Sequence, residues 1–456
     1  MKHYSTQKFY QFTFRLLFLI VAAFILFGTQ SLLAQKEISL EETIAIAIQH
    51  NRKLKVDSIA IGIAQQNTIF EKSTLLPRVE INTQTNHYFQ QPAAFNTIAG
   101  SNLVGYSRPS GKDQSNADLL MEMPILNLPE YKRHEINLLE EKQSQLKYNA
   151  SKIDLRTEVE QVYLRVVILE KKIQLQNKSL TRNRKILEDA RFLFSKGKIS
   201  EADTLSAFAS YYRIEPDILK LQNTLTSGKS RLNLLMGAHL KQDIILTDTL
   251  RYTNTELPII PDAEQIYNDA AINKPGIKIL QFNEDMTAKN VEMAKRYAFP
   301  TIKAVGQYTI QTQANSLEYD KSLYPNTSYI GIKMNIPIML GNAIKSKVQT
   351  AKYENTQATL RIQVAKKLLA SDIADVIALI TESSTSVKKQ LMVVEAATKS
   401  YQITEKQYRN GTSTRIELNI TEDALRTAES DLITATYSFY LAQIELERLQ
   451  ATDVTI

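Results

Sequence analysis

Residues 130–196 have the sequence EYKRHEINLLEEKQSQLKYNASKIDLRTEVEQVYLRVVILEKKIQLQNKSLTRNRKILEDARFLFSK, which contains neither proline nor glycine. This run of 67 residues lies between Pro129 and Gly197. Because an α-helix rises about 1.5 Å per residue, a helix over Glu130–Lys196 would be about 100 Å long, several times the average for globular proteins. A compact domain cannot enclose such a helix, so this stretch predicts an extended fold.

The apolar residues within this run follow a heptad pattern. Intervals of four and three residues separate Leu155, Val159, Val162, Val166, Leu169 and Ile173. This spacing is typical of a left-handed coiled coil. A second run without proline or glycine lies between Gly341 and Gly411, and it repeats the spacing at Leu369, Ile373, Val376 and Ile380. The sequence therefore predicts two long helices that pack lengthwise against others.

Length and composition limit the alternatives. A chain of 456 residues would ordinarily form two to four domains, but 23% charged residues with only 13 glycines and 12 prolines favour one extended helical body. Cysteine is absent. Disulfides, thiolate metal sites, cysteine nucleophiles and a lipid anchor on an N-terminal cysteine are therefore excluded.

Residues 1–34 have the features of a secretory signal peptide. These features are the basic residues Lys2, Lys8 and Arg15, the apolar segment Leu16–Phe27, and the small-residue region Gly28–Ala34. A retained membrane anchor would need about 20 apolar residues, more than this segment supplies. We expect cleavage near Ala34 or Gln35. The segment holds three basic and no acidic residues, so the net charge falls from +7 to +4, too little to favour nucleic acid binding.

Helical and strand patterns alternate along the rest of the chain. A helix is expected from Ser39 to Leu76, with a capping box formed by Ser39 and Glu42 and an interruption at Asn51. After Pro77 the apolar residues alternate, which predicts a strand. A loop over residues 91–115 and a second strand over residues 119–125 then lead to the long helix. The return helix should end at Met236, with a kink or break beside Pro216.

The same order occurs twice, so we interpret the chain as a tandem duplication. Matching positions are Asn51 and Asn273, Pro77 and Pro300, Pro124 and Pro337, and Gly197 and Gly411. The strands of the second half are expected at residues 301–311 and 327–338. The predicted organisation is a first repeat at residues 35–237, a linker at 238–261 and a second repeat at 262–456.

Four strands of this length suit a tilted crossing of a bilayer. Four strands are too few to close a barrel, and a barrel in lipid leaves no strand edge unpaired. The barrel must therefore be shared, with eight strands from two chains or twelve from three. Aromatic residues that suit interfacial girdles are Tyr88, Phe89, Tyr308, Tyr324 and Tyr329. The alternative is a small soluble sheet.

These features together resemble those of the TolC-type outer-membrane efflux proteins. The resemblance rests on Ser39-Leu40-Glu41-Glu42 through Asn51, Leu75-Leu76-Pro77, Met123-Pro124-Ile125, Ile336-Pro337-Ile338, Phe194-Ser195-Lys196-Gly197, Tyr408-Arg409-Asn410-Gly411 and Leu234-Leu235-Met236-Gly237. It covers nearly the whole mature chain. It implies a mainly helical fold with a β-barrel portion, in which a homotrimer closes a 12-stranded barrel in outer-membrane lipid and a helical tunnel in the periplasm. It also implies docking to a periplasmic membrane-fusion adaptor and an inner-membrane pump of the RND or ABC type.

Three groups of residues are candidate functional positions. The prolines Pro77, Pro124, Pro300 and Pro337 are expected to mark switches between helix and strand. The two turns Gly197-Lys198 and Gly411-Thr412 are expected to form the end of the duct farthest from the outer membrane, where the adaptor docks, because glycine permits the left-handed conformation of a helix C-terminal cap.

The third group is a candidate gate. Asp203 and Glu417 each follow a turn glycine by six residues, and Tyr408 precedes Gly411 by three. The resemblance implies that acidic rings and a tyrosine narrow the duct there. Alternatively, Asp203 with Ser200 and Glu417 with Thr414 form capping boxes of the return helices. Two residues depart from the family: Ser413 stands where an arginine tether is expected, and Ile420 replaces a second acidic ring.

No catalytic, cofactor-binding or metal-binding motif occurs. The five histidines are isolated, and the sequence lacks Gly-x-Ser-x-Gly, His-Glu-x-x-His and a phosphate-binding glycine loop. The favoured function is a passive export duct of a tripartite efflux or type I secretion system. A periplasmic adaptor would have one hairpin between glycine-rich β-domains, and a structural coiled coil would not need paired strands in a repeat. The cargo, the individual pump and the resting state of the duct are left open.

Overall fold

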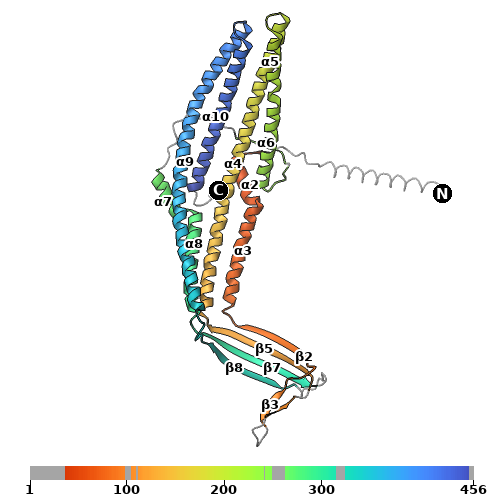
Figure 1. The fold of residues 1–456 in the computed structure, drawn as a ribbon, viewed down its shortest axis with the longest axis vertical. Helices are drawn as coiled ribbons and strands as arrows, with labels where there is room; N and C mark the ends of the chain where they lie inside the picture. The colour runs from red at the N-terminus through yellow and green to blue at the C-terminus, as the bar shows by residue number, and fades with distance from the viewer. Residues whose placement is uncertain are drawn as a thin grey trace, which may run out of the picture.

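The computed structural model describes residues 36–97, 104–108, 111–240, 242–248, 262–314 and 324–450. The molecule is elongated, with a sheet at one end and helical hairpins over the rest of its length (Figure 1). The predicted signal peptide and most of the predicted linker lie outside the described residues. Among the described residues, no helix combines the length and hydropathy that crossing a membrane requires.

Two successive parts of the chain have the same order of elements. The first comprises α2 (Leu40–His50), α3 (Arg52–Ser73), β2 (Arg78–His87), β5 (Asp113–Leu126), α4 (Leu128–Ser195), α5 (Glu201–Tyr212) and α6 (Ile214–Leu235). The second comprises α7 (Ala263–Asn273), α8 (Pro275–Arg296), β7 (Thr301–Ala314), β8 (Asn326–Asn335), α9 (Ala343–Arg409) and α10 (Arg415–Gln450). Two short pairs complete the list: β1 (Lys36–Ile38) with β6 (Ile244–Leu246), and β3 (Ala94–Thr97) with β4 (Val104–Ser107).

The predicted long helices are present as α4 and α9, which contain 68 and 67 residues. The predicted break beside Pro216 is also present, because α5 ends at Tyr212 and α6 begins at Ile214. Tyr212 is four residues before Pro216, and the ring of a proline clashes with the carbonyl group at that position. The second return helix, α10, has no proline and runs unbroken for 36 residues.

The sheet differs from its predicted boundaries in several places, and β7 ends at Ala314 instead of residue 311. The strand expected to begin at Leu119 begins at Asp113, and the expected loop contains the β3–β4 hairpin. The last strand ends at Asn335 instead of residue 338, which leaves Pro337 outside it.

The four prolines therefore occupy three kinds of position, one of which is that of Pro337 after the end of β8. Pro77 and Pro300 stand directly before β2 and β7. Pro124 lies within β5, where the pairing with β7 is irregular. A proline cannot donate to a neighbouring strand, and a bulge tolerates the missing hydrogen bond.

The junction between the two short helices of each repeat also needs a correction. Asn51 joins α2 to α3, and the residue that joins α7 to α8 is Lys274, not Asn273. The side chains have equivalent contacts. Asn51 Nδ2 donates to the carbonyl oxygen of Leu235, 2.8 Å away at the end of α6. Lys274 Nζ donates to those of Arg448 and Leu449, 3.1 and 3.4 Å away at the end of α10.

The four long strands form one antiparallel sheet in the order β2-β5-β7-β8. The contact between β5 and β7 joins the two repeats, while β2 and β8 are the edges. The helices continue this order toward the hairpins, since α4 packs against both α3 and α8, and α8 packs against α9. In the part of the helical body next to the sheet, α3 and α9 therefore lie at the two edges (Figure 1).

The apolar core is divided into four clusters along the helices. The largest surrounds β1, β6, α2 and the middle of α4 and includes Leu232 and Ile244. A second joins α7 to α9 and the end of α10. Two smaller clusters lie near the hairpin turns; one contains Ile186, Tyr408 and Leu418, and the other contains Leu187, Ala190 and Ala207.

Candidate duct wall and gate

One face of the four-stranded sheet is apolar and exposed in the single chain. Its members are Val79, Ile81, Leu119, Met121, Met123, Ile125, Ile330, Ile332 and Met334. The register places Val79 beside Met121 and Ile81 beside Leu119, so the apolar side chains form continuous rows across the strands. A row of this kind suits contact with lipid.

The opposite face carries hydrogen-bonded polar groups. Lys303 Nζ lies 3.1 Å from Glu122 Oε2, and Tyr329 donates to Gln307 Oε1 at 2.8 Å. Asp118 accepts hydrogen bonds from Gln307, Thr309 and Asn116. An alternation of apolar and polar faces is expected where one side meets lipid and the other meets water. The sheet therefore has the chemistry of a channel wall.

The hairpin turns have the conformation that the sequence predicted. Gly197 and Gly411 have φ values of 68° and 76°, in the left-handed region. Lys198 N donates to the Leu193 carbonyl at 3.0 Å, and Thr412 N donates to the Gln407 carbonyl at 2.9 Å. These bonds are typical of a Schellman motif, which satisfies the last carbonyl groups of α4 and α9.

Asp203 lies at the start of α5 in a capping box with Ser200. Its Oδ2 accepts from Ser200 N at 3.1 Å and from Ser200 Oγ at 2.7 Å. The amide of Asp203 donates to Ser200 Oγ in return. The helix-cap interpretation of this carboxylate is therefore present in the single chain.

Glu417 makes the corresponding contacts at the start of the last helix. Its Oε2 accepts from Ser413 Oγ at 2.6 Å and from Thr414 N at 2.8 Å. The bonds from Ser413 and Thr414 lower the pKa of Glu417 below its ordinary value. Ser413, which departs from the family pattern, thus stabilises the charged carboxylate of Glu417 through this hydrogen bond.

Tyr408 lies in the contact between the two hairpins. Its side chain is buried with Ile186, Tyr401, Leu418 and Leu425, and burial raises its pKa. The structure thus brings Tyr408 close to the turns, but within the single chain its ring does not reach an open surface. Asp203 and Glu417 both lie at the same end of the molecule as Tyr408 (Figure 1).

Arg415 is a buried residue that the sequence patterns did not identify. Only 3% of its surface is exposed, and within the described part of the chain none of its Nε, Nη1 and Nη2 atoms has a hydrogen-bond partner. Burial lowers its pKa, while the neighbouring Tyr408 and Glu422 favour the charged form. Its spacing could have predicted this burial, because Arg415 precedes the apolar Leu418 by three residues and therefore lies on the same helix face.

A second buried charge joins the hairpins a few turns further along α10. Glu422 Oε1 accepts from Ser179 Oγ at 2.7 Å and lies 3.3 Å from Arg182 Nη2. Arg182 also lies 3.4 Å from Glu429 and faces the ring of Tyr401. This network connects α4 to α10 through groups that water does not reach freely.

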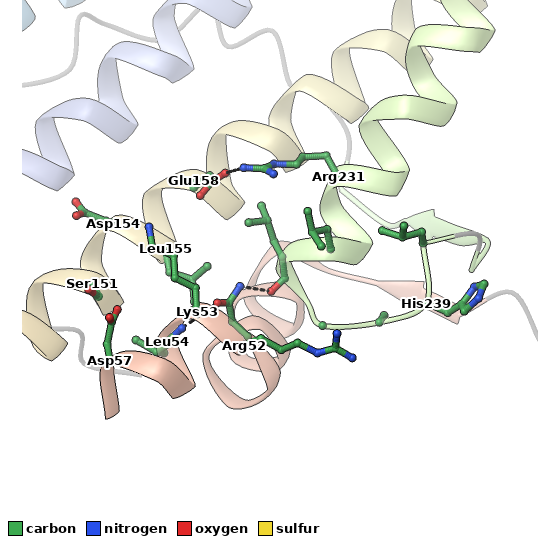
Figure 2. Close-up of a pocket in the computed structure, with 16 residues that line it drawn as sticks. Arg52, Lys53, Leu54, Asp57, Ser151, Asp154, Leu155, Glu158, Arg231 and His239 are labelled. Carbon is green, nitrogen blue, oxygen red and sulfur yellow. Dashed lines mark hydrogen bonds and ion pairs between the residues drawn. The ribbon is translucent and has the colours of Figure 1, made fainter. Parts of the chain in front are cut away.

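A cavity of about 940 Å³ opens where α3, α4 and α6 meet. Figure 2 shows Arg231 pointing to Glu158, with which it forms an ion pair, while Asp57 and Asp154 line the opposite side. Gly237 also lines the cavity. Its φ is 68°, and a Cβ added there would lie 2.5 Å from the His50 carbonyl oxygen. Among the described residues, no group of histidine, cysteine, aspartate and glutamate side chains is arranged to hold a metal ion.

A sheet with one lipid-compatible face, continued by long helical hairpins, defines a wall segment of an envelope channel. Comparison with known families agrees. The profile of the outer membrane efflux proteins matches residues 43–238 and 266–452, which is most of the chain. The chain belongs to this family and is an export duct of the outer membrane.

The relatives have diverged widely in sequence. The chain is 17% identical over 412 residues to the proteases secretion protein PrtF of Dickeya chrysanthemi, covering 89% of this chain and 87% of that protein. It is 20% identical over 312 residues to the outer membrane protein TolC of Vibrio cholerae, covering 68% and 70% of the two chains.

Solved structures show the same fold. The CmeC outer membrane channel of Campylobacter jejuni has a TM-score of 0.75 at 15% identity, covering 91% of this chain and 85% of that one. The open state of the MtrE channel of Neisseria gonorrhoeae has a TM-score of 0.70 at 16% identity, covering 90% and 88%.

Proposed function

We propose that three copies of this chain form a passive export duct, with a 12-stranded barrel in outer-membrane lipid and a helical tunnel in the periplasm. The observation that carries this proposal is the two-faced sheet with two free edges. In lipid each unpaired backbone group costs several kcal/mol, so β2 and β8 need partners. Pairing β8 of one copy with β2 of the next satisfies both edges and closes a ring.

The number of copies can be measured directly. Protein purified from the outer membrane in detergent should be a trimer by native mass spectrometry. A monodisperse monomer with intact strands would overturn the proposal. Because the edges are completed only between copies, the apparent stability should also increase with protein concentration.

We further propose that the hairpin turns dock to a periplasmic adaptor, which links the duct to an inner-membrane pump. The chain itself acts as a conduit and not as an enzyme, and export is driven by the pump. In this orientation the turns that join α4 to α5 and α9 to α10 lie farthest from the sheet (Figure 1). They contain Gly197, Lys198, Gly411 and Thr412. Cysteines placed at Lys198 and Thr412 should crosslink to the adaptor in cells. Crosslinking from the strand loops alone would reverse the orientation.

The gate proposal concerns the carboxylates at these turns. Three copies would bring six of them near one axis, where they would attract cations. The wild-type trimer in a planar bilayer should be cation-selective, and Asp203→Ala with Glu417→Ala should abolish selectivity while the fold persists. If the double variant keeps its selectivity and loses several degrees of thermal stability, the two residues serve as helix caps and the gate lies elsewhere.

A further inference from the structure

A second cavity opens where the start of α2, the middle of α4 and the end of α10 meet. Its volume is about 710 Å³, within the range of small-molecule sites. Helix α4 packs against both α6 and α10, and α10 packs against both α4 and α9. The cavity is therefore bounded by neighbours within one chain, whereas the cavity of Figure 2 lies beside α3, at an edge of the molecule.

The polar part of the lining contains a buried ion pair. Arg156 Nε donates to Glu160 Oε1 at 2.8 Å, and Glu160 is only 6% exposed. Burial raises the pKa of Glu160 and the charge of Glu447 on α10 adds to this, so that Arg156 offsets the two only in part. Glu447 itself is exposed and also lines the cavity. A positively charged group placed in the cavity would therefore be attracted by both carboxylates.

Another carboxylate of the lining is held in place by two hydrogen bonds. Asp248 Oδ2 accepts from the hydroxyl of Tyr163 at 2.7 Å and from the amide of Leu40 at 2.9 Å. Together with Glu41, the lining contains four carboxylates and one guanidinium. The cavity thus has an excess of negative charge, which favours a cationic ligand.

The rest of the lining is mainly apolar and aromatic. It includes Ile44 on α2, Leu164 and Val167 on α4, Ile444 on α10, and the rings of Tyr163 and Tyr440. Small-molecule sites typically combine an apolar lining with a few placed polar groups, and aromatic rings also attract cations. Among the described residues, no group of acidic and histidine side chains is arranged to hold a metal ion. The lining therefore suits an organic cation better than a metal.

The second repeat shows that the fold does not require these polar residues. The positions equivalent to Glu160 and Tyr163, which follow 214 residues later, hold Ala374 and Ile377. Ile377 packs against the apolar cluster that joins α7 to α9. A buried ion pair is seldom more stabilising than an apolar contact of similar volume. Its presence in the first repeat alone therefore indicates a requirement other than stability.

We propose that this cavity is a binding site for a small organic amine with an apolar body, whose ammonium group lies between Glu160 and Glu447. The site is formed within one chain, so this inference depends neither on the assembly of copies nor on export. A bound amine would contact the first repeat through α2 and α4 and the second repeat through α10. Binding should therefore stabilise the packing of the two repeats and raise the melting temperature.

Binding can be measured by titrating the purified protein in a non-ionic detergent with phenylbutylamine, using isothermal titration calorimetry. Two probes of similar shape serve as controls: phenylbutanol carries no charge, and phenylbutyrate carries a negative charge. The amine should bind saturably and at least about tenfold more tightly than either control, because only the amine can form charge-assisted hydrogen bonds with the carboxylates. Equal behaviour of all three probes would indicate partition into detergent and would overturn the proposal.

Variants locate the site. Glu160→Gln should weaken amine binding by about tenfold or more, because it removes the charge of the buried carboxylate. Glu447→Gln changes an exposed side chain, so it should fold normally, and it should weaken binding by about two- to fivefold. The matched control is Glu158→Gln on the same helix, which pairs with Arg231 beside the other cavity and should leave the affinity unchanged. If Glu160→Gln does not fold, Glu447→Gln decides. Unchanged amine affinity in every folded variant would refute the site.

Discussion

The two hairpins follow the same path but bury different chemistry. In the second hairpin, α10 faces the first hairpin and encloses Arg415 and Glu422. At the equivalent positions of the first hairpin, Glu201 and Phe208 are exposed on α5. Both α10 and α5 pack against α4, but Glu422 points into that contact, where it accepts from Ser179 of α4, whereas Phe208 is exposed. Equivalent positions of the two repeats therefore differ in burial because their neighbours differ. Single substitutions at matched positions can measure the resulting difference in the free energy of unfolding.

The largest effect is expected at Glu422. Glu422→Ala leaves the largely buried Arg182 without its closest carboxylate, and breaking such a pair costs about 3 kcal/mol. The matched change in the first hairpin is Phe208→Ala, which in a single chain should cost well under about 1 kcal/mol because the ring is exposed. Denaturant unfolding of both variants checks this. Equal losses would show that the hairpins are energetically equivalent after all.

Arg415→Met should change stability in the opposite direction. The guanidinium is buried without a partner in the described chain, and replacing an unpaired buried charge by an apolar side chain of similar size can stabilise by about 1–2 kcal/mol. Thermal unfolding should shift upward. Glu201→Met, the matched change at an exposed position, should have no such effect. A lower melting temperature for Arg415→Met would mean that the arginine has a partner in the assembly.

The junction residues should differ in their response to pH. Removing either hydrogen bond, by Asn51→Ala or Lys274→Met, should cost about 1 kcal/mol. Burial lowers the pKa of Lys274 below its ordinary value of 10.5. The folded state therefore binds this proton less tightly than the unfolded chain does, and stability contributed by Lys274 should rise as pH increases toward 10.5. Unfolding measured between neutral and alkaline pH should show this rise in the wild type and in Asn51→Ala, and lose it in Lys274→Met.

The smallest effects are expected at the capping boxes. Ser200→Ala and Thr414→Ala should each cost about 0.5–1 kcal/mol, because each removes one side-chain acceptor at an exposed helix start. The second box should also weaken in acid. The lowered pKa of Glu417 means that its contribution is present above its ordinary value of 4.5 and is lost as pH falls below it. A Thr414→Ala variant with unchanged hydrogen exchange in the first turn of α10 would contradict this role.

Local signals in the sequence predicted most of the fold. The absence of proline and glycine predicts α4 and α9 because these are the two residues that most strongly disfavour a helix interior, so nothing interrupts either run. Pro216 predicts the break after α5 for the same local reason. The early start of β5 was missed because Asp113, Gln114, Ser115 and Asn116 are all polar, so no alternation distinguishes them from a loop. Their pairing depends on β2 and β7, which are distant in sequence.

The candidate site was only partly predictable. The turn glycines and both capping boxes are short-range features with fixed spacing, and the structure contains them. The burial of Glu422 depends on its contact with Ser179 of α4, more than 200 residues away in the chain. Arg415 is buried beside Tyr408 of α9 and Glu422 of its own helix, and Tyr408 belongs to another element. The match of Asn51 with Lys274 was missed because the two side chains differ in chemistry while donating to equivalent carbonyl groups.

The division of the apolar core into separate clusters has a consequence for how the molecule opens locally. In a domain with a single core, amide protons deep inside exchange only when the whole domain unfolds. Here the clusters near the turns are small and lie apart from the large cluster around β1 and β6. The tips can therefore fray and exchange their amide protons while the middle of α4 stays protected, so that the end of the duct loosens without melting the rest.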